Sequence, residues 1–579
     1  MSLYFQFDFN EPNKGNESLV FTEPKQVWQT SVIEDVIPTL EEVEQAHRDG
    51  LYVAGYLAYE AAPAFDDHYD VQDTSQPLLL FASFDAPAVE RKGEGLPFYV
   101  HPWQINEDEI TYQDNIHQIK EAIRQGDTYQ VNYTVRLLTK FFGDPYGYYL
   151  MLKEKQQGNY SAYLQYDTQH ILSLSPELFF DVKQSRITTK PMKGTSKRGK
   201  TLDEDRQNKQ HLTSSDKERA ENMMIVDLLR NDLGRLATKG SVTASRLLSV
   251  ETYPTVHQMT STVEATLDET HGLIDWFKAL FPCGSITGAP KIKTMAYIAA
   301  LESSPRGVYC GAIGYLTPNK EAVFNVPIRT VTIDDLTHEA TYGVGGGITW
   351  DSTDTAEYEE VQTKANVLDI DIPEFYLLES FSLKDGVIER FDQHLRRLMQ
   401  SAETFGYPLD LQQMKAAKEQ LETNHPAGQY KVRWLIDKIG QLSVDVIETK
   451  KMVEPVVCYV AKQPIARHHL FSRYKTTYRS HYQACEVKAP DNFSTLLYNE
   501  TSELTEFTIG NVVVQLNGLL YTPPVSSGCL PGIYRQQLLD ENKVMEKVLT
   551  LMDLKQAEKV YITNSVRGMV EVSLKPGFS

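Results

Sequence analysis

The sequence changes character around VLDIDIPEFYLLESF, residues 367–381, and this change limits how the chain can fold. A chain of 579 residues is too long for one hydrophobic core, so it must divide into several folded units. Strand-like and helix-like segments alternate on both sides of the change, which predicts a mixed α/β (α+β) class. We place a boundary near residue 371 and expect the parts 1–105, 106–370 and 371–579.

The residues after this boundary predict a hairpin followed by a helix. FYLLESFSLKDGVIERF reads as two strands that turn at Lys384-Asp385-Gly386, because Asp-Gly is typical of tight hairpin turns. DQHLRRLMQSAETFG then has the apolar spacing of a helix.

Composition excludes several classes of partner. The chain has 57 basic and 78 acidic residues and a net charge of −21, which argues against nucleic acid and against an anionic membrane surface. The five cysteines are scattered, with no Cys-x-x-Cys pair, so we expect reduced thiols and no zinc site. No apolar run approaches bilayer length and no secretory leader is visible, so we expect a soluble cytoplasmic protein.

The stretch PMKGTSKRGKT, residues 191–201, has the spelling of a phosphate-binding P-loop. Its surroundings argue against that function, because Pro191 interrupts the preceding strand and LDEDRQNKQHLTSSD after it offers no sustained apolar face. We expect a polar loop there, before a long helix that starts near Ser215 or Asp216. Lys193 is then either a solvated loop lysine or a lysine held rigidly for chemistry.

Two carboxylate pairs share one spacing. Glu218 and Glu221 are three residues apart on one predicted helix, and Glu357 and Glu360 repeat the arrangement far downstream. Such pairs are usually solvated helix faces, but four carboxylates from two helices would also suit Mg²⁺ held partly through water. The glycine-rich turns between them could bring backbone N–H groups to an anion.

Together and in order, these motifs make the first part similar to the chorismate-utilising enzymes. The resemblance covers residues 50–367 and rests on GDTYQVNYT, SLSPELFF, FPCGSITGAPK, PRGVYCGAIGY and GGGITWDSTDTAEYEE. It implies a large chorismate-binding α/β sandwich, with residues 1–105 as its N-terminal part and 106–370 as its catalytic part. It also implies that chorismate binds together with Mg²⁺.

The resemblance assigns roles to individual residues. Glu221 and Glu360 would bind the metal directly, and Glu218 and Glu357 would support it through water. The two substrate carboxylates would be held by Arg329, Lys291 and the backbone amides around Ser285, Thr287 and Gly346.

Two positions distinguish members within this family. Gln130 stands where members that add water carry a lysine, and glutamine is typical of the members that use ammonia. Lys193, in PMKGT, resembles the lysine of the aminodeoxychorismate synthases, where anthranilate synthases have alanine. The resemblance implies that Lys193 attacks C2 of chorismate, that the C4 hydroxyl leaves with Mg²⁺ assistance, and that ammonia enters at C4 and expels the lysine.

Two further residues complete this implied mechanism. Glu177 would be the general acid/base, and His257 would assist at the C4 oxygen unless it is a core histidine. The alternative is anthranilate synthase component I activity in this part.

The second part resembles the fold-type IV pyridoxal-phosphate enzymes. The order of Lys475, TEFTIGN, LPGIYR and TNS carries this resemblance. It implies that Lys475 is the Schiff-base lysine and that Glu506 keeps the pyridine nitrogen protonated. The amides of Ile533 and Tyr534 and the Asn564-Ser565 stretch would cradle the phosphate.

Next to such a synthase, this part is expected to release pyruvate from 4-amino-4-deoxychorismate and form 4-aminobenzoate, a folate precursor. Lys475 would move the protons. The alternatives are an aminotransferase with another substrate and a non-catalytic assembly domain. A homodimer through this part is expected by analogy. The sequence has no amidotransferase motif, so ammonia is expected from solution or from a separate glutamine amidotransferase subunit.

Overall fold

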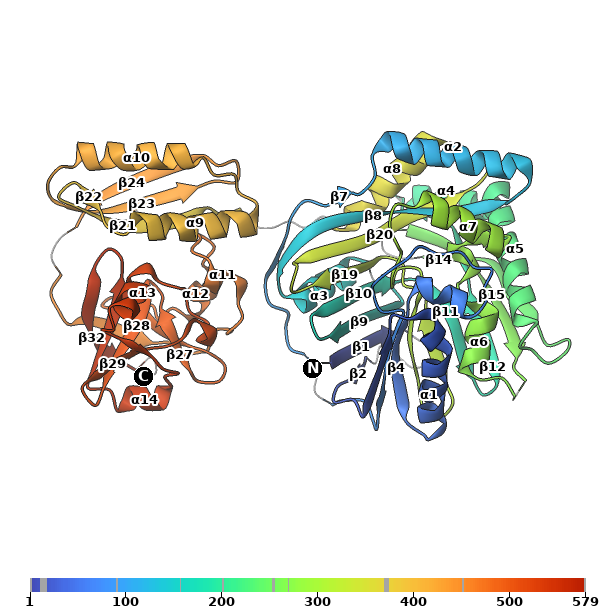
Figure 1. Cartoon of the computed structure of the whole chain (residues 1–579), viewed down its shortest axis with the longest axis horizontal. Helices are drawn as coiled ribbons and strands as arrows, with labels where there is room; N and C mark the ends of the chain where they lie inside the picture. The colour runs from blue at the N-terminus through green and yellow to red at the C-terminus, as the bar shows by residue number, and fades with distance from the viewer. Residues whose placement is uncertain are drawn as a thin grey trace. The chain divides into compact units, whose positions relative to one another are not determined.

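The computed structural model describes residues 3–10, 18–89, 92–156, 158–199, 202–252, 256–268, 270–368, 374–449 and 452–576. The chain divides into two compact units (Figure 1). The first contains residues 1–95, 102–141 and 145–370, and the second contains 96–101, 142–144 and 371–579. Among the described residues, no helix is long and apolar enough to cross a membrane.

The first unit is built on two sheets, each of ten strands among the residues described. The strands of the first sheet are β16 (Gly288–Ala289), β8 (Gln130–Gly143), β20 (Glu339–Ile348), β19 (Thr330–Asp334), β10 (Gln169–Ser175), β9 (Tyr160–Tyr166), β1 (Leu3–Phe9) and β2 (Leu19–Phe21), with β6 (Phe98–Val100) and β7 (Gln104–Ile105) on β8. The strands of the second are β13 (Met192–Lys197), β15 (Val256–Thr266), β12 (Arg186–Lys190), β11 (Leu178–Lys183), β18 (Ala322–Asn325), β17 (Ala312–Leu316), β4 (Tyr52–Leu57), β5 (Leu79–Phe84) and β3 (Gln26–Thr30), with β14 (Thr243–Thr252) on β15.

Helices cover the outer faces of the two sheets. The helices of this unit are α1 (Val36–Arg48), α2 (Glu109–Gln125), α3 (Pro145–Gln156), α4 (Leu202–Ser214), α5 (Asp216–Leu233), α6 (Leu273–Leu280), α7 (Lys291–Leu301) and α8 (Asp354–Ala365). One apolar cluster, including Phe7 of β1 and Tyr315 of β17, lies between the sheets. Another joins the second sheet to α1, α5 and α6. This layering confirms the expected α/β sandwich.

The segment after the P-loop-like stretch is helical, so the expectation of a polar loop was wrong. Helix α4 carries three acidic residues in its first turn, where they are favourable beside the positive end of the helix dipole. Arg198 Nε and the amide of Gly199 donate to Asp205 at 2.7 and 2.8 Å, and Leu212 is buried. Helix α4 is therefore stabilised by one buried leucine and by the hydrogen bonds of its first turn, and not by a continuous apolar face.

The long ladder between β8 and β20 positions much of the first unit's chemistry. The two strands are antiparallel over ten residue pairs, from Glu339↔Lys140 to Ile348↔Val131. This register sets Gly346 opposite Tyr133 and leaves Gln130 at the end of β8. Helix α8 follows β20 and packs on it beside α2, above the ends of both strands (Figure 1).

The second unit contains a small sheet and a ring of strands. The small sheet has the order β22 (Val387–Ile388), β21 (Leu377–Lys384), β23 (Gln429–Ile436) and β24 (Leu442–Glu448), with α9 (Phe391–Phe405) and α10 (Leu411–Asn424). The ring consists of β27 (Leu504–Phe507), β26 (Thr495–Tyr498), β25 (Val456–Val460), β32 (Gly568–Lys575), β31 (Lys559–Asn564) and β28 (Gly510–Leu516). It closes because β27 also pairs with β28.

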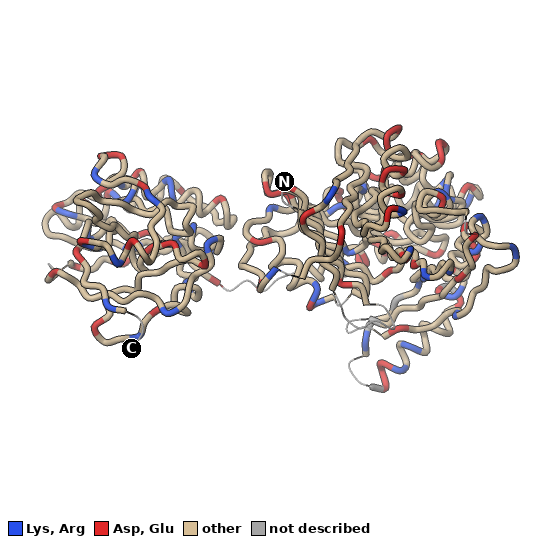
Figure 2. The backbone as a smooth tube through the Cα atoms, turned by 90° about the horizontal axis from the view of Figure 1, so that it is seen from below, with Lys and Arg blue, Asp and Glu red and all other residues tan. Residues whose placement is uncertain are grey.

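Shorter elements complete this unit: α11 (Leu470–Arg473), α12 (Ser480–Cys485), β29 (Leu519–Thr522), α13 (Ile533–Asp540), β30 (Met545–Glu546) and α14 (Leu551–Lys555). Acidic and basic residues are interspersed along the backbone of each unit (Figure 2). The described chain therefore presents no uniformly basic unit for a polyanion.

The hairpin predicted at Lys384-Asp385-Gly386 is present. Lys384 pairs with Val387, and Asp385 and Gly386 have φ values of +47° and +80°. Positive φ at both central residues fits the right-handed twist of the flanking strands and favours Asp-Gly. The predicted helix follows as α9.

We expect Gly386→Ala to lower the free energy of unfolding of the second unit by about 1 kcal/mol, because a β-carbon is unfavourable at positive φ. Contact with neighbours would add little, since the nearest atom to such a β-carbon is 3.5 Å away. Urea unfolding measures the change, and Lys384→Ala in the adjoining strand is the matched control. Equal stability of Gly386→Ala and wild type would contradict this account of the turn.

Candidate active sites

Lys193 lies in β13 among several of the predicted site residues. Its ammonium interacts electrostatically with Glu221 of α5 and with Glu177, which precedes β11. Burial lowers the pKa of Lys193, and the two carboxylates oppose this effect. The competition leaves the amine easier to deprotonate than an exposed lysine, as a nucleophile requires.

Glu177 is the buried acid beside this amine. Burial raises the pKa of Glu177 to about 7, against the hydrogen bond from Ser285 and the charge of Lys193. Its side chain is 3% exposed, and Oε1 has no hydrogen-bond partner among the described residues. A carboxyl that titrates near neutral pH is suited to both giving and taking a proton.

Gln130 faces the same place from β8. Its side chain is buried, and neither amide atom has a hydrogen-bond partner among the described residues. A β-carbon on Gly347 would lie 2.0 Å from Nε2 of Gln130 and 3.5 Å from Nζ of Lys193. Gly347 therefore leaves the space in which the carboxamide and the amine come together, and the unpartnered carboxamide is available to a ligand.

The two carboxylate pairs approach glycine backbones on either side of this position. A β-carbon on Gly346 would lie 3.2 Å from Glu357 and 3.8 Å from Glu360, and one on Gly194 would lie 2.8 Å from Glu218. Glu357 accepts a hydrogen bond from Ser352 at 2.6 Å, and Glu360 pairs with Lys364 at 2.7 Å. Glycines at these positions let carboxylates from α5 and α8 approach the strands that carry Lys193 and Gln130.

The residues predicted to hold substrate carboxylates fall into two groups. Arg329 has a φ of +52°, and its guanidinium makes no hydrogen bond or ion pair with the described residues, so it is available to an anion. Ser285 touches Glu177, and Thr287 donates to the carbonyl of Cys283 at 3.1 Å. Lys291, by contrast, lies 3.3 Å from Asp232 and is buried, so its charge is already compensated.

His257 makes contacts that point away from direct chemistry. It lies on β15, opposite Ser196 of β13, and its side chain is 1% exposed. Nε2 lies 3.1 Å from Asp205 of α4, and Nδ1 lies 3.0 Å from the hydroxyl of Thr252. Asp205 also accepts from Arg198, so this carboxylate links the histidine to the segment that follows Lys193. Sequence reasoning did not identify Asp205 as a site residue.

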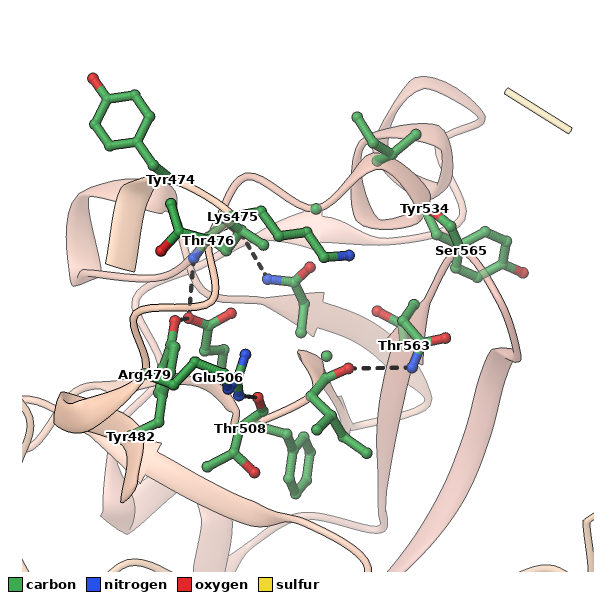
Figure 3. A pocket seen from close by; sticks show the side chains of 18 of the residues that line it. Tyr474, Lys475, Thr476, Arg479, Tyr482, Glu506, Thr508, Tyr534, Thr563 and Ser565 are labelled. Atoms are coloured by element: carbon green, nitrogen blue, oxygen red, sulfur yellow. Dashed lines mark hydrogen bonds between the residues drawn. The ribbon is translucent and has the colours of Figure 1, made fainter. Parts of the chain in front are cut away.

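A second site lies in the second unit around Lys475. The lysine does not lie in a regular strand; its carbonyl accepts a hydrogen bond from Leu378 of β21 at 2.9 Å, and Thr476 forms an isolated bridge with Leu377. Its side chain extends into a pocket that Glu506 faces from below and Tyr534 and Ser565 line at the side (Figure 3). Burial lowers the pKa of Lys475 to about 8, opposed by Glu379 and assisted by nearby cations.

Glu506 is a buried carboxylate on the floor of this pocket. Its Oε1 accepts from the hydroxyl of Tyr482 at 2.7 Å and from the amide of Leu530 at 3.2 Å. Burial raises the pKa of Glu506 to about 7, against these hydrogen bonds. It forms no ion pair with the described residues, so a cationic ring nitrogen would supply the missing partner.

The predicted phosphate cradle lines the same pocket. Ile533 and Tyr534 form the first turn of α13, whose free amides suit an anion. A β-carbon on Gly532 would lie 1.8 Å from Asn511, so this glycine lets the turn approach β28. Asn564 uses its side chain to accept from the amides of Val566 and Arg567, and thereby shapes the turn that carries Ser565.

Arg397 is a pocket residue that the sequence interpretation missed. It lies on α9, lines the pocket, and pairs with Glu379 through Nε at 2.8 Å and Nη2 at 2.7 Å. The helical spacing could have identified Arg397, because Phe391, His394 and Arg397 share the buried face of an amphipathic helix. An arginine on such a face must be paired or must face a ligand.

Two stacked histidines support the floor of the second pocket. The rings of His469 and His481 are 4.0 Å apart, and His481 also packs on Tyr482 at 4.0 Å. Both are buried, and neither nitrogen of His481 has a partner in the described chain. Burial lowers the pKa of His469 to about 4 and that of His481 to about 2, so both rings are neutral in the fold.

Gly347→Ala tests the space shared by Gln130 and Lys193. A β-carbon 2.0 Å from Gln130 Nε2 must displace that side chain, so we expect the free energy of unfolding to fall by about 1–3 kcal/mol. Gln130→Ala removes the opposing atoms and should recover most of the loss in the double variant, as a thermodynamic cycle would measure. Simple additivity of the two substitutions would show that the side chains do not share this space.

The histidine stack predicts a pH dependence of stability. Below pH 6.5 the unfolded chain binds protons that the folded rings reject, so stability of the second unit should fall as pH drops from 6.5 towards 4. His481→Phe should reduce this acid sensitivity when thermal unfolding is compared at neutral and acidic pH. The exposed His68→Gln in the first unit is the control, and an unchanged acid sensitivity in His481→Phe would contradict the assignment.

Comparison with known proteins finds a matching family for each part of the chain. Residues 90–369 match the chorismate binding enzyme family, and residues 376–574 match amino-transferase class IV. The chain is 42% identical over 265 residues to aminodeoxychorismate synthase component 1 of Salmonella typhimurium, covering 46% of this chain and 58% of that protein. It is 37% identical over 266 residues to anthranilate synthase component 1 of Aquifex aeolicus, covering 46% and 53%. The chain therefore spans less than two thirds of the length of these relatives.

Solved structures share the fold of the first unit. Anthranilate synthase component I of Streptococcus pneumoniae is 23% identical with a TM-score of 0.51, covering 63% of this chain and 89% of that one. The menaquinone-specific isochorismate synthase of Escherichia coli is 18% identical with a TM-score of 0.51, covering 63% and 87%. The chain thus joins a chorismate binding enzyme domain, residues 90–369, to an amino-transferase class IV domain, residues 376–574.

Proposed function

We propose that the chain makes 4-aminobenzoate from chorismate in two steps. The first unit replaces the C4 hydroxyl of chorismate with ammonia, giving 4-amino-4-deoxychorismate and water. The second unit converts that compound into 4-aminobenzoate and pyruvate. The observation that carries the proposal is Lys193, an amine with a lowered pKa set between Gln130 and Glu177.

Lys193 distinguishes between the possible products of the first unit. Its neutral amine would attack C2 of the ring as the C4–O bond breaks, while the C1=C2 and C5=C6 double bonds shift to C1=C6 and C4=C5. Glu177, with a pKa of about 7, would protonate the departing hydroxyl so that it leaves as water. Ammonia would then add at C4 and expel the lysine from C2. Gln130 would orient ammonia or the ring through its unpartnered carboxamide.

The four carboxylates are the groups that would hold a magnesium ion. Glu221 and Glu360 would bind it directly and Glu218 and Glu357 through water, since oxygen ligands from two helices suit this hard cation. When bound, Mg²⁺ would supply a Lewis acid for the leaving oxygen. Arg329, which is unpaired in the described chain, would hold a substrate carboxylate, with the backbone around Ser285, Thr287 and Gly346. Lys291 would join them only by leaving Asp232.

His257 would assist the first reaction by positioning the segment that carries Lys193. Thr252 lies 3.0 Å from Nδ1, and Asp205 lies 3.1 Å from Nε2, which makes no hydrogen bond with the described residues, so the ring would lie between the Lys193 segment and α4.

The residues of the second pocket fit pyridoxal phosphate, the cofactor that an amino-transferase class IV domain implies. Ile533, Tyr534 and Ser565 would hold its phosphate, Glu506 would pair with its ring nitrogen, and Lys475 would attach it. When bound, the cofactor would supply an electron sink. Lys475 would remove the ring proton of the substrate and deliver a proton to the departing enolpyruvyl group, a task suited to its pKa of about 8.

Ammonia would come from a separate glutaminase subunit, as the "component 1" in the name of the Salmonella relative suggests. The second unit would also form a homodimer, by analogy with other enzymes of its class.

One incubation tests both steps. With chorismate, ammonium and Mg²⁺, the wild type should form 4-aminobenzoate only when pyridoxal phosphate is present. Lys475→Ala should accumulate 4-amino-4-deoxychorismate, and Lys193→Ala should slow its formation by about 100-fold or more. Chromatography distinguishes these products from anthranilate.

Lys190→Ala, in β12 just before β13 in the sequence and paired with Glu251, controls for loss of a cation near Lys193. Anthranilate as the product of the wild type would overturn the proposal in favour of anthranilate synthase activity. Transamination of amino acids without pyruvate release would assign the second unit to the aminotransferases.

A further inference from the structure

Three cations of the second unit lie together without a carboxylate partner. Lys431 and Arg433 are two residues apart on β23, so their side chains project from the same face of the small sheet. Arg567 lies in the turn between Asn564 of β31 and Gly568 of β32. None of the three forms an ion pair with the described residues.

Lys431 is close enough to both arginines for their positive charges to act on it. Burial lowers the pKa of Lys431, and the positive charges of Arg567 and Arg433 lower it further, with no carboxylate opposing them. The cross-strand neighbours of Lys431 are Ser382 and Ile447, and those of Arg433 are Ser380 and Asp445. Asp445 is thus the carboxylate nearest in register, yet it makes no ion pair with Arg433. Gathering like charges without a counter-ion is unfavourable unless a ligand supplies it.

This cation cluster, Lys431, Arg433 and Arg567, lies outside the residues that line the Lys475 pocket, but neighbouring elements connect it to that pocket in two places. Lys431 is among the charges that lower the pKa of Lys475. The strand beside β23 is β21, whose Leu378 amide donates to the carbonyl of Lys475. At the other place, Asn564 and Ser565 line the pocket and lead directly into Arg567.

We propose that the cation cluster binds the carboxylates of the second unit's substrate, so that this unit selects a dianionic ring compound over a neutral or monoanionic one. The inference rests on the proposed function and deepens it, because 4-amino-4-deoxychorismate carries one carboxylate on the ring and one on the enolpyruvyl group. A guanidinium and an ammonium together suit carboxylates, and the bound anion would relieve the repulsion between Lys431 and the two arginines.

The other anion that could occupy the cluster is the phosphate of the cofactor. The pocket already offers that phosphate the amides of Ile533 and Tyr534 and the turn at Ser565. The cluster is therefore assigned to the substrate. Loss of substrate affinity without loss of cofactor distinguishes the two anions.

The test uses the full-length protein loaded with pyridoxal phosphate and isophthalate, a ring with two carboxylates. Binding is followed by the change in cofactor absorption, which reports on the second unit alone, and by calorimetry. Wild type should bind isophthalate more tightly than benzoate. Lys431→Gln and Arg433→Gln should each raise the dissociation constant by about ten-fold or more, because each loses a charge-assisted contact.

Arg567→Gln, at the more exposed position, should have a smaller effect of the same sign. Lys438→Gln, on the turn after β23 and outside the cluster, is the matched control and should bind like wild type. Cofactor content should be unchanged in all four variants. The same substitutions should raise the KM for 4-amino-4-deoxychorismate and leave kcat largely intact, which a general loss of structure would not do.

Equal binding of isophthalate by wild type and the Lys431 and Arg433 variants would overturn the proposal, as would loss of cofactor from those variants. Calorimetry can also be run on protein prepared without cofactor. There, isophthalate should bind at the cluster in wild type and should not bind at that site in the Lys431 and Arg433 variants. Failure of the proposed reaction has a different signature: isophthalate would bind through the cluster while no pyruvate is released.

Discussion

The antiparallel register of β8 and β20 is the constraint on which the first unit's chemistry depends. Because the side chains alternate along each strand, a slip of one residue would turn Gln130 away from Lys193 and move Gly347 out of its place. The register is also held a few residues farther along β8: Glu302 accepts from the amide of Thr134 at 2.9 Å and pairs with Arg136 at 3.1 Å. Buried charge pairs of this kind tolerate little displacement, so they specify one alignment.

In both units a buried lysine has a pKa below that of an exposed lysine. In each, burial favours the neutral amine and nearby carboxylates restrain the shift: Glu221 and Glu177 at Lys193, and Glu379 at Lys475. Each site also contains a buried carboxyl whose pKa rises to about 7, Glu177 in one and Glu506 in the other. The folds are unrelated, so the likeness arises from what amine chemistry demands of its surroundings.

Sequence reasoning identified the candidate site residues that stand in recognisable motifs. Lys193, Gln130, Lys475 and Glu506 stand in ordered motifs, and the structure brings them to two sites. Sequence reasoning could not identify residues whose role depends on a partner far away in the chain. Asp205 matters because Arg198 and His257 converge on it, and Arg397 because α9 turns it into the pocket. Helix α4 escaped detection for a related reason, since anchored charges rather than apolar spacing stabilise it.

The closed ring of the second unit places its site at the seam. Glu506 of β27 pairs with Asn511 of β28, and Asn511 pairs in turn with Thr563 of β31. The strands that complete the ring, β31 and β32, come from residues 559–575. During synthesis on the ribosome, β28 therefore lacks its β31 partner until nearly the whole unit has emerged. The cofactor pocket is consequently among the last features to form, and a chain cut short before Lys559 would expose the edge of β28 beside Glu506, where other strands could pair with it.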